Sequence, residues 1–368
     1  MIYIYQDPNW PNFSWNNDLI NKKADHVRYL QGYLLGRIES LGFEDAQNSL
    51  FHHLTDDVMN TSAIEGENLD IEMVRSSIAR KLGLPYGGIK TPIERSVDGI
   101  VTILLDATLN YSAEISEDRL FYWHKELFPL GVSGFSKINV GRYRTDENGP
   151  MQVVSGYIGR EKIHFSAMDA KNLRQEMKIF YQWFNENNEF NPLIKAAIAH
   201  LWFITLHPFD DGNGRIARLL TDMLLARSEK KAQRFYSMST SIKEMRKGYY
   251  DILEKTQKGS LDITEWLVWF LDCLEHSIIS SQNKIEQTLT KSNFWNHARS
   301  YALNQRQVKM INMLLDGFEG KLTTSKWGEI NKCSQDSAYR DILDLIDKKI
   351  LQKVENENGR STNYVLIM

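Results

Sequence analysis

The residues best suited to chemistry lie close together, in the stretch His-Pro-Phe-Asp-Asp-Gly-Asn-Gly-Arg-Ile-Ala-Arg that begins at His207. His207 can accept a proton near neutral pH. Asp211 offers the kind of carboxylate oxygen that binds Mg²⁺ beside nucleotide phosphates. Arg215 and Arg218 share one face of a helix and can hold phosphate groups. Such a concentration of groups indicates nucleotidyl or phosphoryl transfer.

The elements around this stretch can position those groups. An apolar helix over 196–206 is stopped by Pro208, a loop with two glycines follows, and a new helix is expected to begin at about Gly214 or Arg215. Backbone N–H groups at a helix start are unpaired and attract anions. The loop therefore predicts a phosphate site that precedes the two arginines.

Other interpretations of the same stretch fit less well. Gly212, Gly214 and Ala217 match the dinucleotide-binding glycine pattern, but a helix and not a strand precedes them. The acidic run fails the spacing of a calcium loop at Arg215, and no P-loop sequence occurs in the chain. The remaining alternative is a turn between helices with a capping asparagine and solvated arginines.

The stretch matches the signature HPF-x-[DE]-GNGR-x-x-R without a departure, so the chain resembles the Fic family. That resemblance implies a mainly helical enzyme that transfers AMP from ATP to a Tyr, Ser or Thr hydroxyl of a protein, itself included. It implies that His207 is the general base, Phe209 a buried anchor and Asp211 the Mg²⁺ ligand. The ATP-binding residues it implies are Asp211, Gly212, Asn213, Gly214, Arg215, Ile216, Ala217 and Arg218. The kinase-like Doc branch lacks this glycine pattern, so the two glycines favour AMP transfer.

A second segment resembles a regulatory element of the same family. Residues 61–66, Thr-Ser-Ala-Ile-Glu-Gly, fit the inhibitory pattern [ST]-x-x-x-E-[GN]. The resemblance implies that Glu65 pairs with Arg218 and displaces the γ-phosphate, because a carboxylate competes with phosphate for one guanidinium. The alternative is a glutamate at a helix end before a glycine cap.

Two further groups of residues are candidates for substrate contacts. Residues 151–157 and 162–165 read as strands around a turn at Gly159, and this hairpin has the spacing of the family's target-docking flap. Tyr249, Tyr250 and Gln257 lie where related proteins hold adenine and ribose, although core packing is a rival explanation. The flap residues proposed to receive the target are Val153, Val154, Ser155, Gly156 and Tyr157.

The composition restricts the class of protein. The chain has 368 residues, 42% of them hydrophobic, and a formal net charge of −3. This composition excludes a disordered or low-complexity chain and argues against a protein built to coat nucleic acid or membranes. Two cysteines are too few for a disulfide framework or a multi-cysteine metal site. Without a secretory signal or a spanning segment, we expect a cytoplasmic protein.

The predicted fold is mainly α: a helical Fic core with a β-hairpin flap, followed by a winged helix-turn-helix. The expected domains are an N-terminal helical domain over 1–110, a catalytic domain over 111–290 and a winged-helix domain over 291–368. Helices are expected, among others, over 71–82, 169–188, 192–206, 215–227, 243–258 and 262–289. Three helices and a β-ribbon predict the winged helix.

The predicted winged helix bears on a rival function. Residues 304–368 hold ten Lys and Arg against nine Asp and Glu, whereas a DNA reader needs a clear cationic surface. We therefore favour a protein-interaction role, although Arg340, Lys326, Lys332 and Arg360 keep DNA binding open. The alternative function is a nucleotide-sensing transcriptional regulator or adaptor. An intact His207 favours the enzyme, because sensing needs no base. Related proteins often form homodimers, so a homodimer is possible here.

Overall fold

The computed structural model describes residues 3–39, 43–84, 93–134, 136–147, 149–156, 160, 162–186, 190–232, 234–354 and 362–367, with the backbone alone for 43–46. Tyr157 and Gly159 of the predicted flap, and Arg360 of the predicted wing, lie outside these residues.

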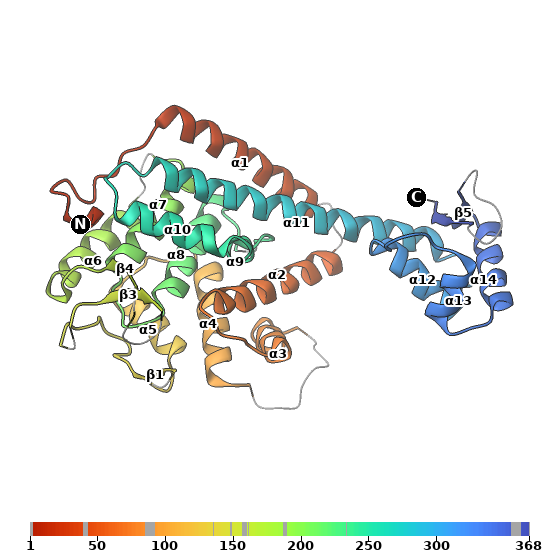
Figure 1. Cartoon of the computed structure of the whole chain (residues 1–368), viewed down its shortest axis with the longest axis horizontal. Coiled ribbons are helices and arrows are strands. Elements are labelled where there is room, and N and C mark those ends of the chain that lie inside the picture. Colours follow the sequence, from red (N-terminus) through yellow and green to blue (C-terminus); the bar gives the residue numbers. More distant parts are fainter. Residues whose placement is uncertain are drawn as a thin grey trace. The chain divides into compact units, whose positions relative to one another are not determined.

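The described residues are mainly helical, which confirms the predicted fold class (Figure 1). The chain divides into two compact units, Met1–Ser281 and Gln282–Met368. The split of the first unit into a helical and a catalytic domain stays a prediction. The helices of the first unit are α1 (Asn17–Glu39), α2 (Phe43–Ile64), α3 (Ile71–Leu82), α4 (Arg95–Leu109), α5 (Glu117–Leu127), α6 (Ala170–Asn185), α7 (Pro192–Leu206), α8 (Asn213–Glu229), α9 (Met238–Glu244), α10 (Arg246–Gln257) and the start of α11 (Thr264–Ala298), with a short 3₁₀ turn, η1 (Ile4–Gln6), before them.

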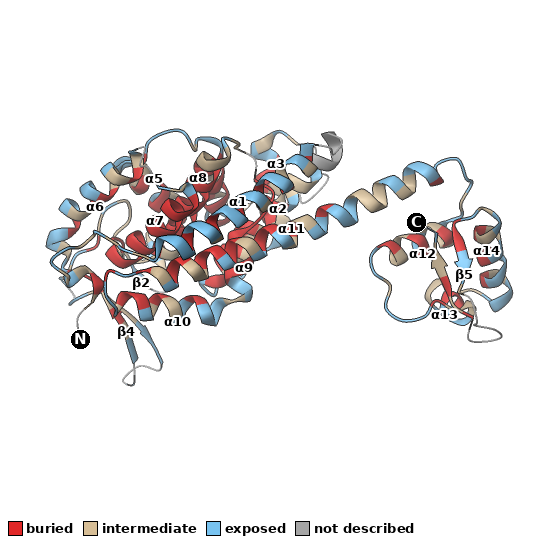
Figure 2. Ribbon diagram, turned by 90° about the horizontal axis from the view of Figure 1, so that it is seen from above, coloured by how far each residue is buried: buried red, intermediate tan, exposed pale blue. Residues whose placement is uncertain are grey.

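The core of the first unit is built on α7, whose described side chains from Leu193 to Leu206 are all buried (Figure 2). Asn191 caps its start and Pro192 occupies its first turn, a position where the missing N–H costs nothing. A helix that is apolar on every face belongs at the centre of a domain. The packing partner of α7 is α8, which begins after the predicted loop.

The segment that resembles the inhibitory element lies at the end of α2, and α3 follows it in sequence. α2 ends at Ile64, and Gly66 then adopts a left-handed φ of 87°, as its predicted place after a helix end requires. α3 spans the predicted 71–82: Asp70 accepts hydrogen bonds from the first turn, and Gly83 closes the last turn in the left-handed conformation.

Two of the predicted helices differ from the structure by more than a few residues. The segment expected as one helix over 243–258 is two helices, because Ser237 caps an earlier start for α9 and Met245 leaves the helical conformation between α9 and α10. α11 runs on to Ala298 instead of stopping at 289. No glycine or proline interrupts that stretch, so nothing in the backbone ends the helix earlier.

The predicted hairpin consists of β3 (Gln152–Ser155) and β4 (Lys162–Ser166), paired antiparallel with a register shift between Val153 and Val154. Its outer part is largely exposed (Figure 2). A smaller antiparallel pair, β1 (Val132–Ser133) with β2 (Ser136–Lys137), lies between α5 and the hairpin in sequence.

The second unit has the predicted order of three helices and two strands. The elements are α12 (Gln305–Leu315), α13 (Thr324–Asn331), α14 (Gln335–Asp347), β5 (Leu351–Lys353) and β6 (Tyr364–Leu366). Trp327, Ile342 and Leu345 are among the fully buried side chains of its own hydrophobic core. The assignment as a winged helix, and its role, stay predictions. Among the described helices of either unit, none is long and apolar enough to cross a membrane.

Candidate functional site

The loop between α7 and α8 has a shape set by its own residues. His207 takes a left-handed φ of 48° at the end of α7, and Pro208 prevents the helix from continuing. Gly212 has a φ of 81°, and α8 then begins at Asn213, slightly earlier than predicted. Asn213 spans the loop: its side chain accepts from the Phe209 N–H at 3.0 Å and donates to the Phe209 carbonyl at 2.8 Å.

Two buried residues that the sequence analysis did not single out brace this loop. Arg144 donates to the His207 carbonyl at 2.8 Å, while its own backbone N–H donates to the Pro208 carbonyl. His124 stacks on Phe209 at 4.2 Å between ring centres; its Nδ1 accepts from a backbone N–H, so its Nε2–H donates to the Asp211 carbonyl. Burial lowers the pKa of His124 to about 4, which keeps this arrangement neutral.

Of the two residues that brace the loop, only His124 lies in a sequence pattern that indicates a buried, hydrogen-bonded side chain. His124 lies on the apolar face of α5, between Leu120 and Leu127, and a histidine in such a position is usually buried with partners. Arg144 lies in an irregular segment after Gly141, and we find no pattern that marks it.

His207 is placed to act as a base. Its ring Nδ1 faces the Ile204 carbonyl at 3.3 Å, which favours the tautomer with a proton on Nδ1 and a free lone pair on Nε2. Burial lowers the pKa of His207 to about 4, so the ring is neutral at physiological pH. It lines a pocket of about 620 Å³ together with Asp211, Gly214 and the hairpin residue Ser155.

Arg218 is held by the end of α2. Its Nη2 contacts Glu65 Oε1 at 2.7 Å and the Thr61 carbonyl at 3.0 Å, and its Nε donates to the Thr61 hydroxyl at 2.7 Å. The predicted pairing of Glu65 with Arg218 is thus present. Burial alone would lower the pKa of Arg218, but the Glu65 charge offsets this and leaves the pKa raised. Arg218 Nη1 is buried without a hydrogen-bond partner among the described residues.

Gly214 explains how Glu65 comes so close. A Cβ built on Gly214 would lie 2.2 Å from Glu65 Oε1 and 3.2 Å from Arg218 Nη1. Any larger residue would therefore push the carboxylate away. The glycine leaves the start of α8 open, and in this structure Glu65 fills that space.

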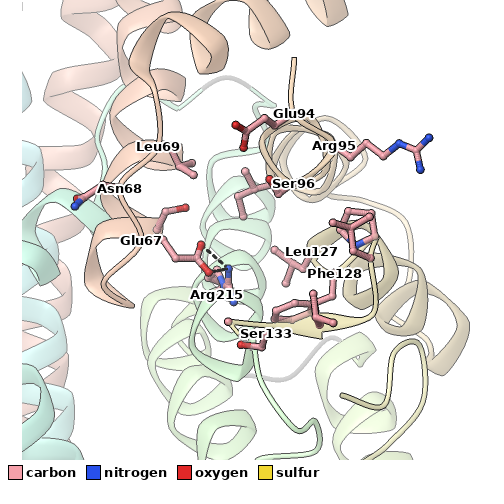
Figure 3. Close-up of a pocket in the computed structure, with 16 residues that line it drawn as sticks. Glu67, Asn68, Leu69, Glu94, Arg95, Ser96, Leu127, Phe128, Ser133 and Arg215 are labelled. Atoms are coloured by element: carbon pink, nitrogen blue, oxygen red, sulfur yellow. Dashed lines mark hydrogen bonds and ion pairs between the residues drawn. The ribbon is translucent and has the colours of Figure 1, made fainter. Parts of the chain in front are cut away.

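Arg215 pairs with a second carboxylate, from Glu67, which the sequence analysis did not single out. Arg215 Nη1 donates to both carboxylate oxygens of Glu67 at 2.8 Å (Figure 3). The guanidinium also lies 5.0 Å from the centre of the Phe128 ring. Arg215 and Glu67 line a second pocket, of about 610 Å³, whose lining shares no residue with the first. Both phosphate-binding candidates are therefore paired with acidic residues that follow α2.

Asp211 can serve as a metal ligand, with help from a substrate. Its carboxylate accepts from the Ser133 hydroxyl and from the Gly212 N–H, and lies 3.9 Å from Arg215. No cluster of three or more His, Cys, Asp or Glu suited to a metal occurs among the described residues. One carboxylate fits Mg²⁺, which usually takes one or two protein carboxylates and completes its shell with phosphates and water. A single carboxylate does not suit a metal ion whose ligands all come from the protein.

The other predicted ATP-binding residues divide into two groups. Ile216 and Ala217 are fully buried and line neither pocket. Tyr249 is buried, with its hydroxyl bonded to His200 at 2.8 Å, and it also lines the His207 pocket. Tyr250 is 40% exposed and lines the His207 pocket, as does Gln257, whose amide donates to the Thr205 hydroxyl at 3.2 Å.

The hairpin lies at the same pocket. Val153, Val154 and Ser155 are among the residues that line it. Gly156 follows with a φ of 107°, a conformation that suits glycine at the start of a turn. The structure thus brings the loop, Glu65, Tyr250 and the strand β3 to a single pocket.

Comparison with known families agrees with the geometry. The fold and the loop define a helical domain in which a loop with two glycines leads into a buried helix, α8. The model of the Fic/DOC family matches residues 114–225, which include the whole loop, and residues 3–84 match a domain of unknown function, DUF4172. The predicted resemblance to the Fic family is therefore confirmed for residues 114–225.

Curated relatives carry the same family name. The protein adenylyltransferase fic-1 of Caenorhabditis elegans is 29% identical over 175 residues, 46% of this chain and 31% of that protein. The protein adenylyltransferase Fic of Culex quinquefasciatus is 28% identical over 225 residues, 60% of this chain and 40% of that protein. The chain thus spans less than half the length of these relatives.

Solved structures show the same fold. A Fic family protein from Desulfovibrio desulfuricans G20 superposes with a TM-score of 0.52 at 18% identity, covering 94% of this chain and 96% of that one. Fic-1 of Caenorhabditis elegans gives a TM-score of 0.51 at 22% identity and covers 74% of each chain.

Proposed function

We propose that the protein transfers AMP from ATP to a Tyr, Ser or Thr hydroxyl of a target protein, and to itself. The observation that carries this proposal is the pocket that joins a neutral His207, the start of α8 and an exposed β-hairpin. The names of the relatives support it.

The chemistry follows from the arrangement of groups. The triphosphate would lie over the N–H groups at the start of α8, with its outer phosphates on Arg215 and Arg218. A target hydroxyl beside His207 loses its proton to Nε2 as its oxygen forms a bond to the α-phosphorus. The bond from that phosphorus to the bridging oxygen breaks, and pyrophosphate leaves while the arginines stabilise its charge. Asp211 would hold Mg²⁺, which neutralises phosphate charge during the transfer.

The structure corresponds to an inhibited state under this proposal. Glu65 and Glu67 occupy the guanidinium groups that the outer phosphates need. Carboxylate and phosphate compete for the same donors, so ATP must displace Glu65 or bind in an unproductive position. Glu67 is the more exposed carboxylate, with 46% of its side chain accessible against 28% for Glu65, so solvent screens its contact more.

The hairpin supplies a docking edge for the target. An extended peptide can add to an exposed strand through main-chain hydrogen bonds, which fixes its backbone without demanding one sequence. Val153, Val154, Ser155 and Gly156 would receive it, and Tyr250 and Gln257 would contact the nucleoside. Such docking would place a hydroxyl of the peptide beside His207.

The test uses ATP labelled at the α-phosphate, with Mg²⁺ and the full chain. We expect weak self-labelling in the wild type and an increase of ~10-fold or more in Glu65→Gly, which frees Arg218. Glu67→Gln should give a smaller increase, of ~2- to 5-fold, because its ion pair is more screened. The matched control is Glu72→Gln, since Glu72 pairs with Arg75 within α3, where both side chains are partly exposed.

A second variant separates chemistry from binding. His207→Ala in the Glu65→Gly background should bind ATP but transfer no label. Labelling that persists in this double variant would show that His207 is not the general base. Equal or lower labelling in Glu65→Gly than in the wild type would refute the inhibition, and no labelling in any variant would refute the transferase itself.

A further inference from the structure

The β3–β4 hairpin needs support from outside its own two strands. An isolated two-stranded hairpin is at best marginally stable in water. The end of the hairpin nearest Ser166 is anchored by Phe165, whose ring is buried against Tyr3 and Tyr5, and by the Tyr5 hydroxyl, which donates to the Ser166 carbonyl at 2.9 Å. These contacts do not reach the outer residues that line the pocket.

A chain of hydrogen bonds holds the outer part instead. His164 of β4 lies 2.6 Å from Glu254 of α10 through its Nδ1, and 2.5 Å from the Ser155 hydroxyl of β3 through its Nε2. Glu254 also accepts from Lys258 at 2.5 Å, within α10. One imidazole therefore joins both strands of the hairpin to α10.

This arrangement does not depend on the protonation of His164. A neutral ring donates from Nδ1 to Glu254 and accepts the Ser155 hydroxyl proton at Nε2, whereas a charged ring donates from both nitrogens. Hydrogen bonds from Lys258 and then from His164 lower the pKa of Glu254 to about 2, so the carboxylate is ionised at all working pH values. Charge-assisted hydrogen bonds of this kind are stronger than neutral ones.

We propose that Glu254 and His164 form a clamp that fixes the docking edge of the hairpin at its working distance from His207. Both residues line the same pocket as His207, Ser155 and Tyr250. They are positioning residues, acting on the target through β3 and making no bond to the reacting atoms. The inference rests on the proposed function of the hairpin as a docking edge. It adds that α10, which carries Tyr250, also sets the place of the target.

The clamp is tested first by hydrogen exchange in the full-length protein. Glu254→Gln should speed exchange of the backbone amides of β3 and β4 by ~10-fold, with α7 and α8 unchanged. His164→Phe should do the same, while His164→Asn, which keeps a donor near Nδ1, should retain most of the protection. The matched control is Glu265→Gln. It removes the ion pair between Glu265 of α11 and Lys255, which lies on α10 as Glu254 does.

The second measurement addresses docking. Glu65→Gly enzyme, with or without Glu254→Gln, transfers labelled AMP to a separate full-length acceptor copy that carries His207→Ala. We expect Glu254→Gln to raise KM for the acceptor by ~5- to 10-fold and to leave KM for ATP unchanged.

Three outcomes are informative. Hairpin exchange equal to that of the Glu265→Gln control would overturn the clamp. A raised KM for ATP would also overturn it, since Glu254 would then act at the nucleotide. Acceptor labelling that is absent even with Glu65→Gly alone would count against the proposed function, whereas faster hairpin exchange in Glu254→Gln would still support the clamp.

Discussion

Two walls of the His207 pocket, which residues of α10 also line, are built differently. The loop and the start of α8 form one wall, where Phe209 is fully buried and Asn213 is 2% exposed. The hairpin forms the other, where Val154 and Ile163 are 47% and 46% exposed. The loop is fixed by buried hydrogen bonds to backbone groups, and the hairpin by a few side-chain contacts.

This difference matches the two tasks that we propose. Phosphate positioning and proton transfer need groups held within a fraction of an ångström, which buried and fully paired side chains provide. Docking of a protein segment needs an open strand edge that can adjust to a partner. Changes in the loop should therefore cost both stability and activity, and changes in the hairpin little stability.

The largest effect is expected for Asn213→Ala. The variant loses both hydrogen bonds to Phe209 and leaves a buried N–H and a buried carbonyl without partners. The free energy of unfolding should fall by ~2 to 4 kcal/mol, and labelling in the Glu65→Gly background should be lost. Denaturant unfolding and the ATP assay measure the two effects.

The control for that variant is Asn172→Ala, at an exposed position of α6. Its free energy of unfolding should change by less than ~0.5 kcal/mol. A loss below ~1 kcal/mol in Asn213→Ala would show that the loop is held by contacts other than its own hydrogen bonds.

The next largest effect is the pH dependence of label incorporation, which tests whether His207 is buried in the wall formed by the loop. Burial lowers the pKa of His207 to about 4 from the usual value near 6.5, so the base stays neutral over the physiological range. We expect the rate of label incorporation to be flat from ~pH 8 down to ~pH 5.5 and to fall only below that. A half-maximal rate near ~pH 6.5 would mean that His207 is solvated.

The same shift has a consequence for stability. The unfolded chain binds protons at His207 and His124 near pH 6.5, whereas the folded chain resists protonation until about pH 4. Their contribution to the free energy of unfolding is therefore complete above ~pH 6.5 and declines as the pH falls toward 4. The rates should be measured alongside circular dichroism, so that acid unfolding is separated from protonation of the base.

The sequence predicted the buried wall better than the exposed one. The loop residues are contiguous, and their types follow from local rules: Pro208 ends a helix, glycines permit unusual backbone, and arginines recur on one face. The same kind of local rule predicted the first and last residues of α3 and of α7 correctly. Phe209 is fully buried, as its place in the signature implies.

What the sequence did not reveal depends on contacts between distant segments. Arg144 and His124 act on the loop from positions more than sixty residues upstream. Glu67 meets Arg215 only because the backbone after α2 turns back over α8. A spacing rule cannot find such partners, since it compares neighbours in the chain. Likewise, only the fold shows that Tyr249 is buried while its neighbour Tyr250 is 40% exposed.

The smallest effect is expected on the exposed wall, for Val154→Thr. Valine and threonine are both β-branched and suit a strand. Position 154 is 47% exposed, so the threonine hydroxyl can contact water without a change in the side chain's position. The free energy of unfolding should change by less than ~0.5 kcal/mol in a denaturant titration. Labelling of the acceptor copy should change by less than ~3-fold, because docking on a strand edge relies mainly on main-chain hydrogen bonds. A loss of more than ~1 kcal/mol would show that the hairpin is packed as firmly as the loop, and the contrast between the two walls would then fail.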